Sequence, residues 1–346
     1  MHLLVTGGAG FIGSAFVRRR LAQTSDEIVV LDKLTYAGNR ANLAPCEVDP
    51  GQAERLQFVR GDICDEAVVT SLVENADAVV NFAAESHVDR SIMDAEAFLR
   101  TGVIGVHVLL EAVRRATDAG RRVRLVQVST DEVYGEVEDG RSVETDALAP
   151  RSPYASAKAA GELLVAAYRT THGTDTVVTR GANTYGPYQH PEKVVPLFIT
   201  NAMDDAQLPL YGDGLQQRDW LHVDDHADGV GFVLDHGESG EAYNVAGAGL
   251  RTNRDLTAAI LELLGKPWSL VRSVPDRPGH DVRYCMDGAK LARLGWQPSV
   301  ALEPGLAETV AWYSANREWW SQAKSGDWAA YYENQYGRRL AESVEA

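Results

Sequence analysis

The chain lacks the features that mark several classes of protein. It has three cysteines in 346 residues (Cys46, Cys64 and Cys285), and they are scattered along the sequence. Their odd number and spacing argue against a disulfide framework and are typical of the reduced thiols of a cytoplasmic protein. No cluster of His, Cys and Asp has metal-ligand spacing, so we expect no metal site. Internal repeats and low-complexity segments are lacking as well.

Basic charge and long apolar runs are also scarce. The 33 Lys and Arg stand against 49 Asp and Glu, which gives a formal net charge of −16. Because nucleic-acid-binding surfaces are usually basic, we expect no nucleic-acid partner. No run approaches the ~20 apolar residues of a membrane span, and the first residues enter a strand without a secretory signal pattern. We therefore expect no membrane association and a cytoplasmic location.

What the sequence does contain is an alternation of short apolar runs with longer helical patterns. This order implies right-handed strand–helix–strand units, and hence an α/β fold with a Rossmann-type doubly wound parallel sheet. The expected buried strands are 3–6, 28–31, 56–59, 78–82, 123–128 and 176–179, and the expected helices include 11–23, 98–115 and 153–171.

The pattern loosens after about residue 180. Loops punctuated by proline (Pro187, Pro191, Pro196 and Pro209) precede an expected helix at 222–236, then a strand–helix unit to about 265 and loop-rich sequence over 266–290. We interpret this as a smaller, interleaved α/β substrate domain. The predicted division is a Rossmann-type domain over 1–180 with an interleaved segment at about 215–245, and the smaller domain over 181–214 and 246–346.

A glycine-rich loop follows the first strand and opens the first helix. Gly8, Gly10 and Gly13 fit the G-x-G-x-x-G dinucleotide pattern, and Gly7 with the latter two fits a related spacing. Such a loop lets a pyrophosphate approach the helix N-terminus. Asp32 ends the second strand about 20 residues further on, where a carboxylate takes the ribose hydroxyls and disfavours the extra phosphate of NADP. NAD is therefore the expected cofactor; Asp62, after the third strand, either meets the adenine or merely ends a strand.

Residues 129–132, Ser-Thr-Asp-Glu, directly follow the fifth expected strand, at the edge of the sheet that faces the cofactor. Tyr154 and Lys158 begin the next helix, which Ser152-Pro153 predicts as a cap and first position. The two share a helical face, so we expect the ammonium to hold the phenol near ionisation. The two acids are either solvated loop charges or an acid–base pair for chemistry in addition to oxidation.

These motifs together resemble the extended short-chain dehydrogenase/reductase family, and within it the group of dTDP-glucose 4,6-dehydratases. The resemblance spans nearly the whole chain. Besides the glycine loop and the Tyr–Lys pair, it is carried by residues 32–39, 85–91, 130–132, 180–189, 209–214, 218–225 and 277–280.

The resemblance implies a reaction sequence. Tyr154 would deprotonate the C4 hydroxyl of the sugar while hydride passes to NAD, and Thr130 would hydrogen-bond that oxygen. Glu132 would then remove the C5 proton, Asp131 would protonate the departing C6 hydroxyl, and the hydride would return to C6. Members of the family are usually homodimers formed through two helices, for which 98–115 and 153–171 are the candidates.

The resemblance also implies contacts. Beyond the loop glycines, NAD contacts are expected from Phe11, Ile12, Asp32, Lys33, Leu34, Thr35, Gly38, Asp62, Ile63, Phe82, Ala83, Ala84, Ser86, Thr101, Ser129, Tyr154, Lys158 and Asn183. Nucleotide-sugar contacts are expected from Ser86, Thr130, Asn183, Lys193, Val194, Pro209, Tyr211, Arg218, Asn253, Arg277 and His280. Guanidinium groups match phosphate oxygens, which favours Arg218 and Arg277 for the diphosphate; Tyr211 is a candidate to pack on the base.

Other polar and aromatic residues have a plainer interpretation. His87, His222, Asp224 and Asp225 suit a helix cap or another structural role. Trp312, Trp319, Trp320 and Trp328 are expected to pack the C-terminal part of the chain, with Tyr332 a weaker candidate for ligand contact. Two rival functions stay open: a nucleotide-sugar 4-epimerase, which needs no acid pair, and a non-catalytic NAD-sensing protein, which tends to lack the Tyr–Lys pair.

Overall fold

A computed structural model describes residues 1–277, 279–325, 327–341 and 343–345; Pro278, part of one motif above, lies outside them. The predicted parallel sheet is confirmed, with seven strands in the order β10-β6-β5-β4-β1-β2-β3. Each strand pairs in parallel with its neighbours. The strands are β1 (His2–Thr6), β2 (Glu27–Asp32), β3 (Leu56–Arg60), β4 (Ala78–Asn81), β5 (Arg124–Thr130), β6 (Thr176–Gly181) and β10 (Ala242–Val245).

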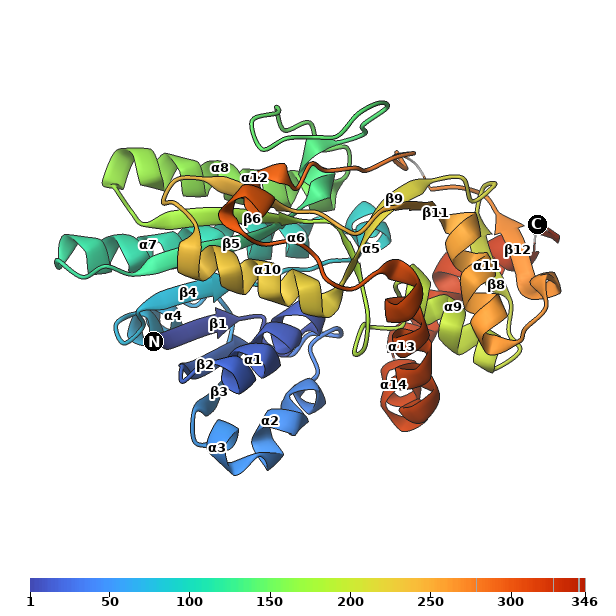
Figure 1. The fold of residues 1–346 in the computed structure, drawn as a ribbon, viewed down its shortest axis with the longest axis horizontal. Coiled ribbons are helices and arrows are strands. Elements are labelled where there is room, and N and C mark those ends of the chain that lie inside the picture. Colours follow the sequence, from blue (N-terminus) through green and yellow to red (C-terminus); the bar gives the residue numbers. More distant parts are fainter. Residues whose placement is uncertain (278, 326, 342, 346) are drawn as a thin grey trace.

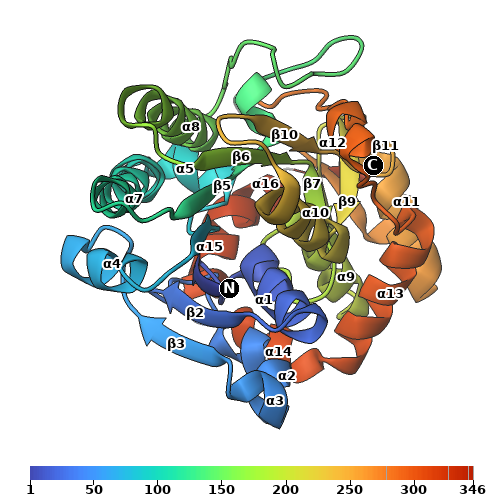
Figure 2. The same ribbon diagram turned by 60° about the vertical axis from the view of Figure 1, so that its left-hand side comes forward.

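Helices cover both faces of this sheet. On one side lie α1 (Phe11–Gln23) and α10 (Val223–His236), and on the other α4 (Glu66–Val73), α7 (Val106–Asp118) and α8 (Pro153–His172), as Figure 2 shows. Each side has its own apolar core. The strand order reverses between β1 and β4, and in such sheets ligands bind at the carboxyl ends of the strands beside this reversal.

A second part of the molecule lies beyond the carboxyl ends of the strands, around β8, β9 and β12 in Figure 1. It contains two small sheets, β11-β9-β7 and β13-β12-β8. Trp320 is buried in its core, and Trp312, Trp319 and Trp328 pack against that core as predicted. Its elements are β7 (Asn183–Tyr185), α9 (Val194–Met203), β8 (Leu208–Tyr211), β9 (Gln217–His222), β11 (Leu250–Thr252), α11 (Asn253–Leu264), β12 (Val271–Val274), α13 (Leu302–Ala315), α14 (Arg317–Ala323) and β13 (Val344–Glu345).

Two segments predicted as loops are regular structure. Helix α9 occupies part of the proline-rich stretch. Pro196 is compatible with it because it is the third residue of the helix, where a backbone N–H has no intrahelical partner to lose. Strand β12 lies within 266–290 and pairs in parallel with β8. The domain boundaries stay a prediction: Met286 and Leu291, predicted in the second domain, pack in a core of the large sheet.

No helix among the described residues is both long and apolar enough to cross a membrane.

Candidate active site

A cavity of about 290 Å³ lies at the carboxyl ends of β1, β4, β5 and β6. It brings together, as predicted, residues that come from distant parts of the sequence. Every residue predicted to contact NAD lines this cavity except Leu34. The backbone N–H of Leu34 instead donates to Asp32 Oδ1 at 2.8 Å. Of the residues predicted for the sugar, Ser86, Thr130, Asn183, Lys193 and Val194 line the same cavity.

The glycine loop has the shape of a diphosphate cradle. Gly7 has φ +68°, and a Cβ on it would lie 2.5 Å from the backbone N of Ala83. A Cβ on Gly13 would lie 2.3 Å from the Gly7 carbonyl oxygen. Gly10 caps α1 without a side chain, so the start of the helix stays open toward the cavity. Gly8 packs against Val30 instead, so the spacing that matters is that of Gly7, Gly10 and Gly13.

Asp32 ends β2 at the rim of this cradle and is buried. Its Oδ2 accepts from the Ala9 N–H at 3.0 Å, and its Oδ1 accepts from Leu34. Each carboxylate oxygen has a second lone pair for a ribose hydroxyl. Lys33 lies 3.8 Å from Asp62 and 3.5 Å from Glu85, a cavity residue for which we predicted no role. The cradle and the acceptors therefore fit a dinucleotide.

The acid doublet is not a pair of solvated loop charges. Asp131 and Glu132 begin the short helix η3 (Asp131–Tyr134), and Asp131 is only 3% exposed. Its Oδ1 accepts from Thr130 Oγ1 at 3.0 Å, while its Oδ2 is buried and has no hydrogen-bond partner among the described residues. Burial, with the charge of Glu132, raises the pKa of Asp131 to about 8. Asp131 is therefore a protonated acid at neutral pH.

Glu132 lies in different surroundings. Burial raises the pKa of its carboxyl, but the positive charges of Arg277, Lys193 and Arg218 oppose that rise. The charge of Arg218 acts on both carboxyls, whereas the charges of Arg277 and Lys193 are among the main ones acting on Glu132. Such a difference separates the proton affinities of two neighbouring acids.

Tyr154 lies in the first turn of α8, whose start is capped by Ser152 as predicted: Ser152 Oγ accepts from the Ala155 N–H at 3.1 Å. Burial, and next the charge of Glu132, raise the pKa of Tyr154, whereas its hydrogen bond with Thr130 opposes the rise. Lys158 donates to the Val128 carbonyl at 2.6 Å, and burial lowers the pKa of its ammonium to about 8. The Tyr154 phenol is thus protonated in this arrangement, and assistance by Lys158 stays a prediction.

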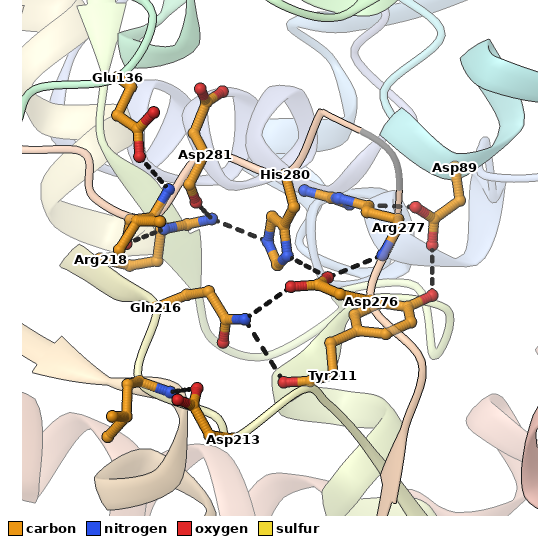
Figure 3. A network of polar contacts seen from close by, with 12 residues as sticks. Asp89, Glu136, Tyr211, Asp213, Gln216, Arg218, Asp276, Arg277, His280 and Asp281 are labelled. Atoms are coloured by element: carbon orange, nitrogen blue, oxygen red, sulfur yellow. Dashed lines mark hydrogen bonds and ion pairs between the residues drawn. The ribbon is translucent and has the colours of Figure 1, made fainter.

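Four of the remaining predicted sugar contacts, Tyr211, Arg218, Arg277 and His280, belong to a second cluster, shown in Figure 3. Arg218 on β9 donates to the Asp281 carbonyl at 2.8 Å and lies 3.0 Å from His280 Nε2. Because Arg218 is a donor only, His280 accepts there and donates from Nδ1 to Asp276 at 2.6 Å. Burial and the charges of Arg277 and Arg218 lower the His280 pKa to about 4, so the ring is neutral.

The two clusters meet through Glu132, on which the charges of both arginines act. Asn253 begins α11 beside the second cluster, where its N–H donates to the Gln216 carbonyl at 3.0 Å. Its Oδ1, like that of Asn183, is buried without a partner among the described residues. Pro209 and Tyr211 lie on β8, and the Tyr211 hydroxyl donates to Asp89 at 3.0 Å.

Several cavity residues were missed. Gln189 lies in a motif that we singled out, but His190, Glu192 and His226 follow no strand end and carry no spacing signal. His222 caps α10 as predicted, accepting from the Asp224 N–H at 3.3 Å. Within the part of the chain that the structure describes, no group of His, Cys, Asp and Glu is arranged to hold a metal ion.

Comparison with known proteins agrees with this arrangement. A family model described as GDP-mannose 4,6 dehydratase matches residues 4–309. A dTDP-glucose 4,6-dehydratase of Streptomyces niveus is 51% identical over 344 residues, which cover 98% of this chain and 100% of that protein. The chain belongs to the dTDP-glucose 4,6-dehydratase family.

A solved member of the dTDP-glucose 4,6-dehydratase family, DesIV of Streptomyces venezuelae, was crystallised with NAD bound. It has a TM-score of 0.89 and 53% identity, covering 94% of this chain and 100% of its own. The NAD complex of UDP-glucose 4-epimerase from Thermus thermophilus is less similar, with a TM-score of 0.83 and 34% identity over 91% of this chain and 100% of its own. The predicted resemblance is confirmed.

Proposed function

We propose that this protein is a hydro-lyase that uses NAD to convert dTDP-glucose into dTDP-4-keto-6-deoxyglucose and water. The acid doublet beside Tyr154, in which Asp131 is buried and Glu132 partly exposed, carries this proposal, because an elimination needs one protonated and one ionised carboxyl. A 4-epimerase of the same fold needs no such doublet. The 51% identical relative from Streptomyces niveus carries the name of this activity.

The residues around the glycine loop are those that would hold NAD: Gly7, Gly10 and Gly13 at the diphosphate, and Asp32 at the ribose. When bound, NAD takes the hydride from C4 of the sugar and returns it to C6. The carboxylate of Asp32 disfavours the additional phosphate of NADP at that ribose.

Tyr154 and Thr130 act at the C4 hydroxyl. Tyr154 removes its proton, and Thr130 holds the same oxygen by a hydrogen bond. Lys158, which is buried and one helical turn after Tyr154 on α8, carries the positive charge that stabilises the phenolate. The resulting C4 ketone makes the C5 proton acidic.

Glu132 and Asp131 then remove water across C5 and C6. Glu132 takes the C5 proton as a general base, and Asp131 gives its proton to the C6 hydroxyl, which leaves as water. The cations near Glu132 favour its ionised form, and the burial of Asp131 favours its protonated form. The two roles are therefore assigned by surroundings and not by residue type.

Binding of the substrate is assigned to the cations and the two unpartnered amides. Arg218, Arg277 and Lys193 bind the diphosphate, since two guanidinium forks and an ammonium complement its charge. Asn183 and Asn253 have acceptor oxygens suited to hydroxyl groups of the sugar or ribose. Pro209 and Tyr211 are assigned to the base, and Ser86, Val194 and His280 to the rim of the site.

The test is turnover of dTDP-glucose in deuterated water, with dTDP-4-keto-6-deoxyglucose as the expected product and solvent deuterium at C5. Asp131→Asn and Glu132→Gln should each slow water loss by roughly 10²–10⁴-fold with NAD content unchanged. Glu138→Gln/Asp139→Asn, an exposed acid pair in the following loop, is the matched control and should turn over normally. Full turnover by the Asp131→Asn/Glu132→Gln double variant, or a C4-inverted product without label, contradicts the proposal.

We further propose a cytoplasmic homodimer formed through α7 and α8. Three large apolar side chains that are at least half exposed support it: Leu163 on α8, and Leu99 and Ile104 just before α7. The thiols of Cys46, Cys64 and Cys285 are free, which suits a reducing compartment. A monomeric mass in sedimentation velocity would contradict the dimer. The cytoplasmic location would be contradicted if thiol titration of protein isolated from its cells found these cysteines oxidised.

A further inference from the structure

One residue of the motif over residues 85–91, Asp89, has no role in the chemistry above. Residues 85–91 lead into α5 (Val88–Met93), and the side chain of its Asp89 is buried under the second cluster, 4% exposed. Asp89 Oδ1 accepts from Arg277 Nη1 at 3.1 Å (Figure 3). A guanidinium assigned to the substrate is thus held by a carboxylate from the cofactor side of the molecule.

The other oxygen of Asp89 is held from two directions. Asp89 Oδ2 accepts from the Tyr211 hydroxyl at 3.0 Å and from Gln335 Nε2 at 3.1 Å. Gln335 also donates to the Tyr211 hydroxyl at 2.8 Å, which closes a triangle of hydrogen bonds. Gln335 is 6% exposed and belongs to η5 (Glu333–Gly337), near the C-terminal end of the chain. Asp89 therefore accepts from three segments at once.

The charge at Asp89 is maintained despite its burial. Burial alone would raise the pKa of this carboxyl, but the Arg277 charge and the Tyr211 hydrogen bond bring it below its ordinary value. Asp89 is thus ionised at neutral pH. Arg277 has five side-chain donors, and its one hydrogen bond to Asp89 leaves donors for a ligand.

The neighbouring residue braces the same helix. The Arg90 guanidinium lies 4.0 Å from the ring centre of Tyr36 and 4.1 Å from that of Tyr331, and its Nε donates to Glu192 at 2.9 Å. Tyr36 belongs to the loop after β2, and Glu192 precedes Lys193. Helix α5 is therefore tied to the cofactor side, to the Lys193 loop and to the C-terminal segment.

We propose that Asp89, braced by Gln335, is a positioning residue that holds Arg277 against the diphosphate of the nucleotide sugar. This inference rests on the proposed function. The C-terminal segment thereby contributes to substrate affinity through Asp89, without a role in the chemical steps at Tyr154 or the acid doublet.

An amide at position 89 cannot satisfy the same three donors. Its single oxygen can face either Arg277 or the pair formed by Tyr211 and Gln335. An oxygen facing Arg277 leaves the NH₂ group opposite the donor Nε2 of Gln335, and in either orientation the negative charge paired with Arg277 is lost. Asp89→Asn therefore keeps the shape of the side chain and breaks the arrangement. Gln335→Leu removes the brace from the opposite end and leaves the ion pair in place.

The experiment compares NAD-loaded variants of the full chain in steady-state turnover of dTDP-glucose and in calorimetric titration with dTDP. We expect Asp89→Asn to raise KM and the dTDP dissociation constant by roughly 10- to 100-fold, as for loss of a charge-assisted hydrogen bond. Gln335→Leu should raise both by less, about 5-fold, because Gln335 acts on Arg277 only through Asp89 and the ion pair remains. In both variants kcat stays within about twofold and NAD content is unchanged, because only uniform binding is lost. Asp118→Asn and Gln322→Leu, at exposed positions, are the matched controls.

A double-mutant cycle with Arg277→Gln tests whether Asp89 acts through that arginine. Asp89→Asn should add no further loss of dTDP affinity in the Arg277→Gln background. Additive effects, or normal KM and dTDP affinity in folded Asp89→Asn, overturn the proposal. If Asp89→Asn does not fold, a normal KM and a normal dTDP affinity in Gln335→Leu overturn the proposal instead. Absence of turnover by the unaltered protein contradicts the proposed function instead, and the dTDP titrations still decide the role of Asp89.

Discussion

The cofactor side and the nucleotide side of the site are built in different ways. On the cofactor side, Gly7, Asp32 and Thr130 stand at or directly after the ends of parallel strands, so the topology of one sheet brings them together. On the nucleotide side, Arg218, Arg277 and His280 come from a short strand and a loop. They are placed by side-chain contacts with the Asp281 carbonyl, the buried acid Asp89 and the exposed acid Asp276. The backbone of the sheet keeps its place when one side chain is removed. Removing one partner of a buried ion pair instead leaves the other charge unpaired and displaces its neighbours.

The largest effect is expected on the cofactor side, where the chemistry takes place. Tyr154→Phe keeps the ring packed 6.3 Å from Phe98 but removes the proposed base. Formation of NADH in a single turnover with dTDP-glucose should fall by roughly 10²–10⁴-fold while NAD content stays normal. Tyr168→Phe, further along the same helix, is the control. Persistent C4 oxidation by Tyr154→Phe would refute the role of this tyrosine.

An intermediate effect is expected on the nucleotide side. Arg218→Lys keeps the positive charge but loses the guanidinium fork that reaches both His280 and the Asp281 carbonyl. KM for dTDP-glucose should rise about 10- to 100-fold with little change in kcat, the size expected for charge-assisted hydrogen bonds. Arg251→Lys, at an exposed ion pair with Glu303, serves as the control. A lowered kcat with normal KM in Arg218→Lys would contradict the assignment of the nucleotide side to substrate binding alone.

The smallest effect is expected from pH. Asp131 must be protonated to act as an acid, and its pKa of about 8 means that the protonated form prevails below that pH. Activity should therefore be retained at pH 7 and fall about tenfold per unit once the pH exceeds the Asp131 pKa. The check is a kcat profile from neutral to alkaline pH on protein with full NAD content. If the alkaline limb persists unchanged in Asp131→Asn, it belongs to another group.

The contrast between the two sides also explains what could be predicted from the sequence. Strand-end residues such as Asp32, Asp131 and Glu132 are predictable, because their place in the chain is also their place in the sheet. Helix α9 was missed because Pro196 signals a loop anywhere except in a first helical turn. Periodicity does not reveal contacts of other kinds. His226 lines the cavity from within a helix, and Asp89 contacts Arg277 across more than a hundred residues of the chain.

The contact between Asp89 and Gln335 spans 246 positions of the chain, and this separation orders events during synthesis. The first strands of the large sheet and the glycine loop leave the ribosome long before Gln335 is made, and N-terminal units fold first. The nascent chain can therefore form its glycine loop before the contact between Gln335 and Asp89, which positions Arg277, exists. The order of synthesis thus allows the cofactor site to form before the substrate site is complete.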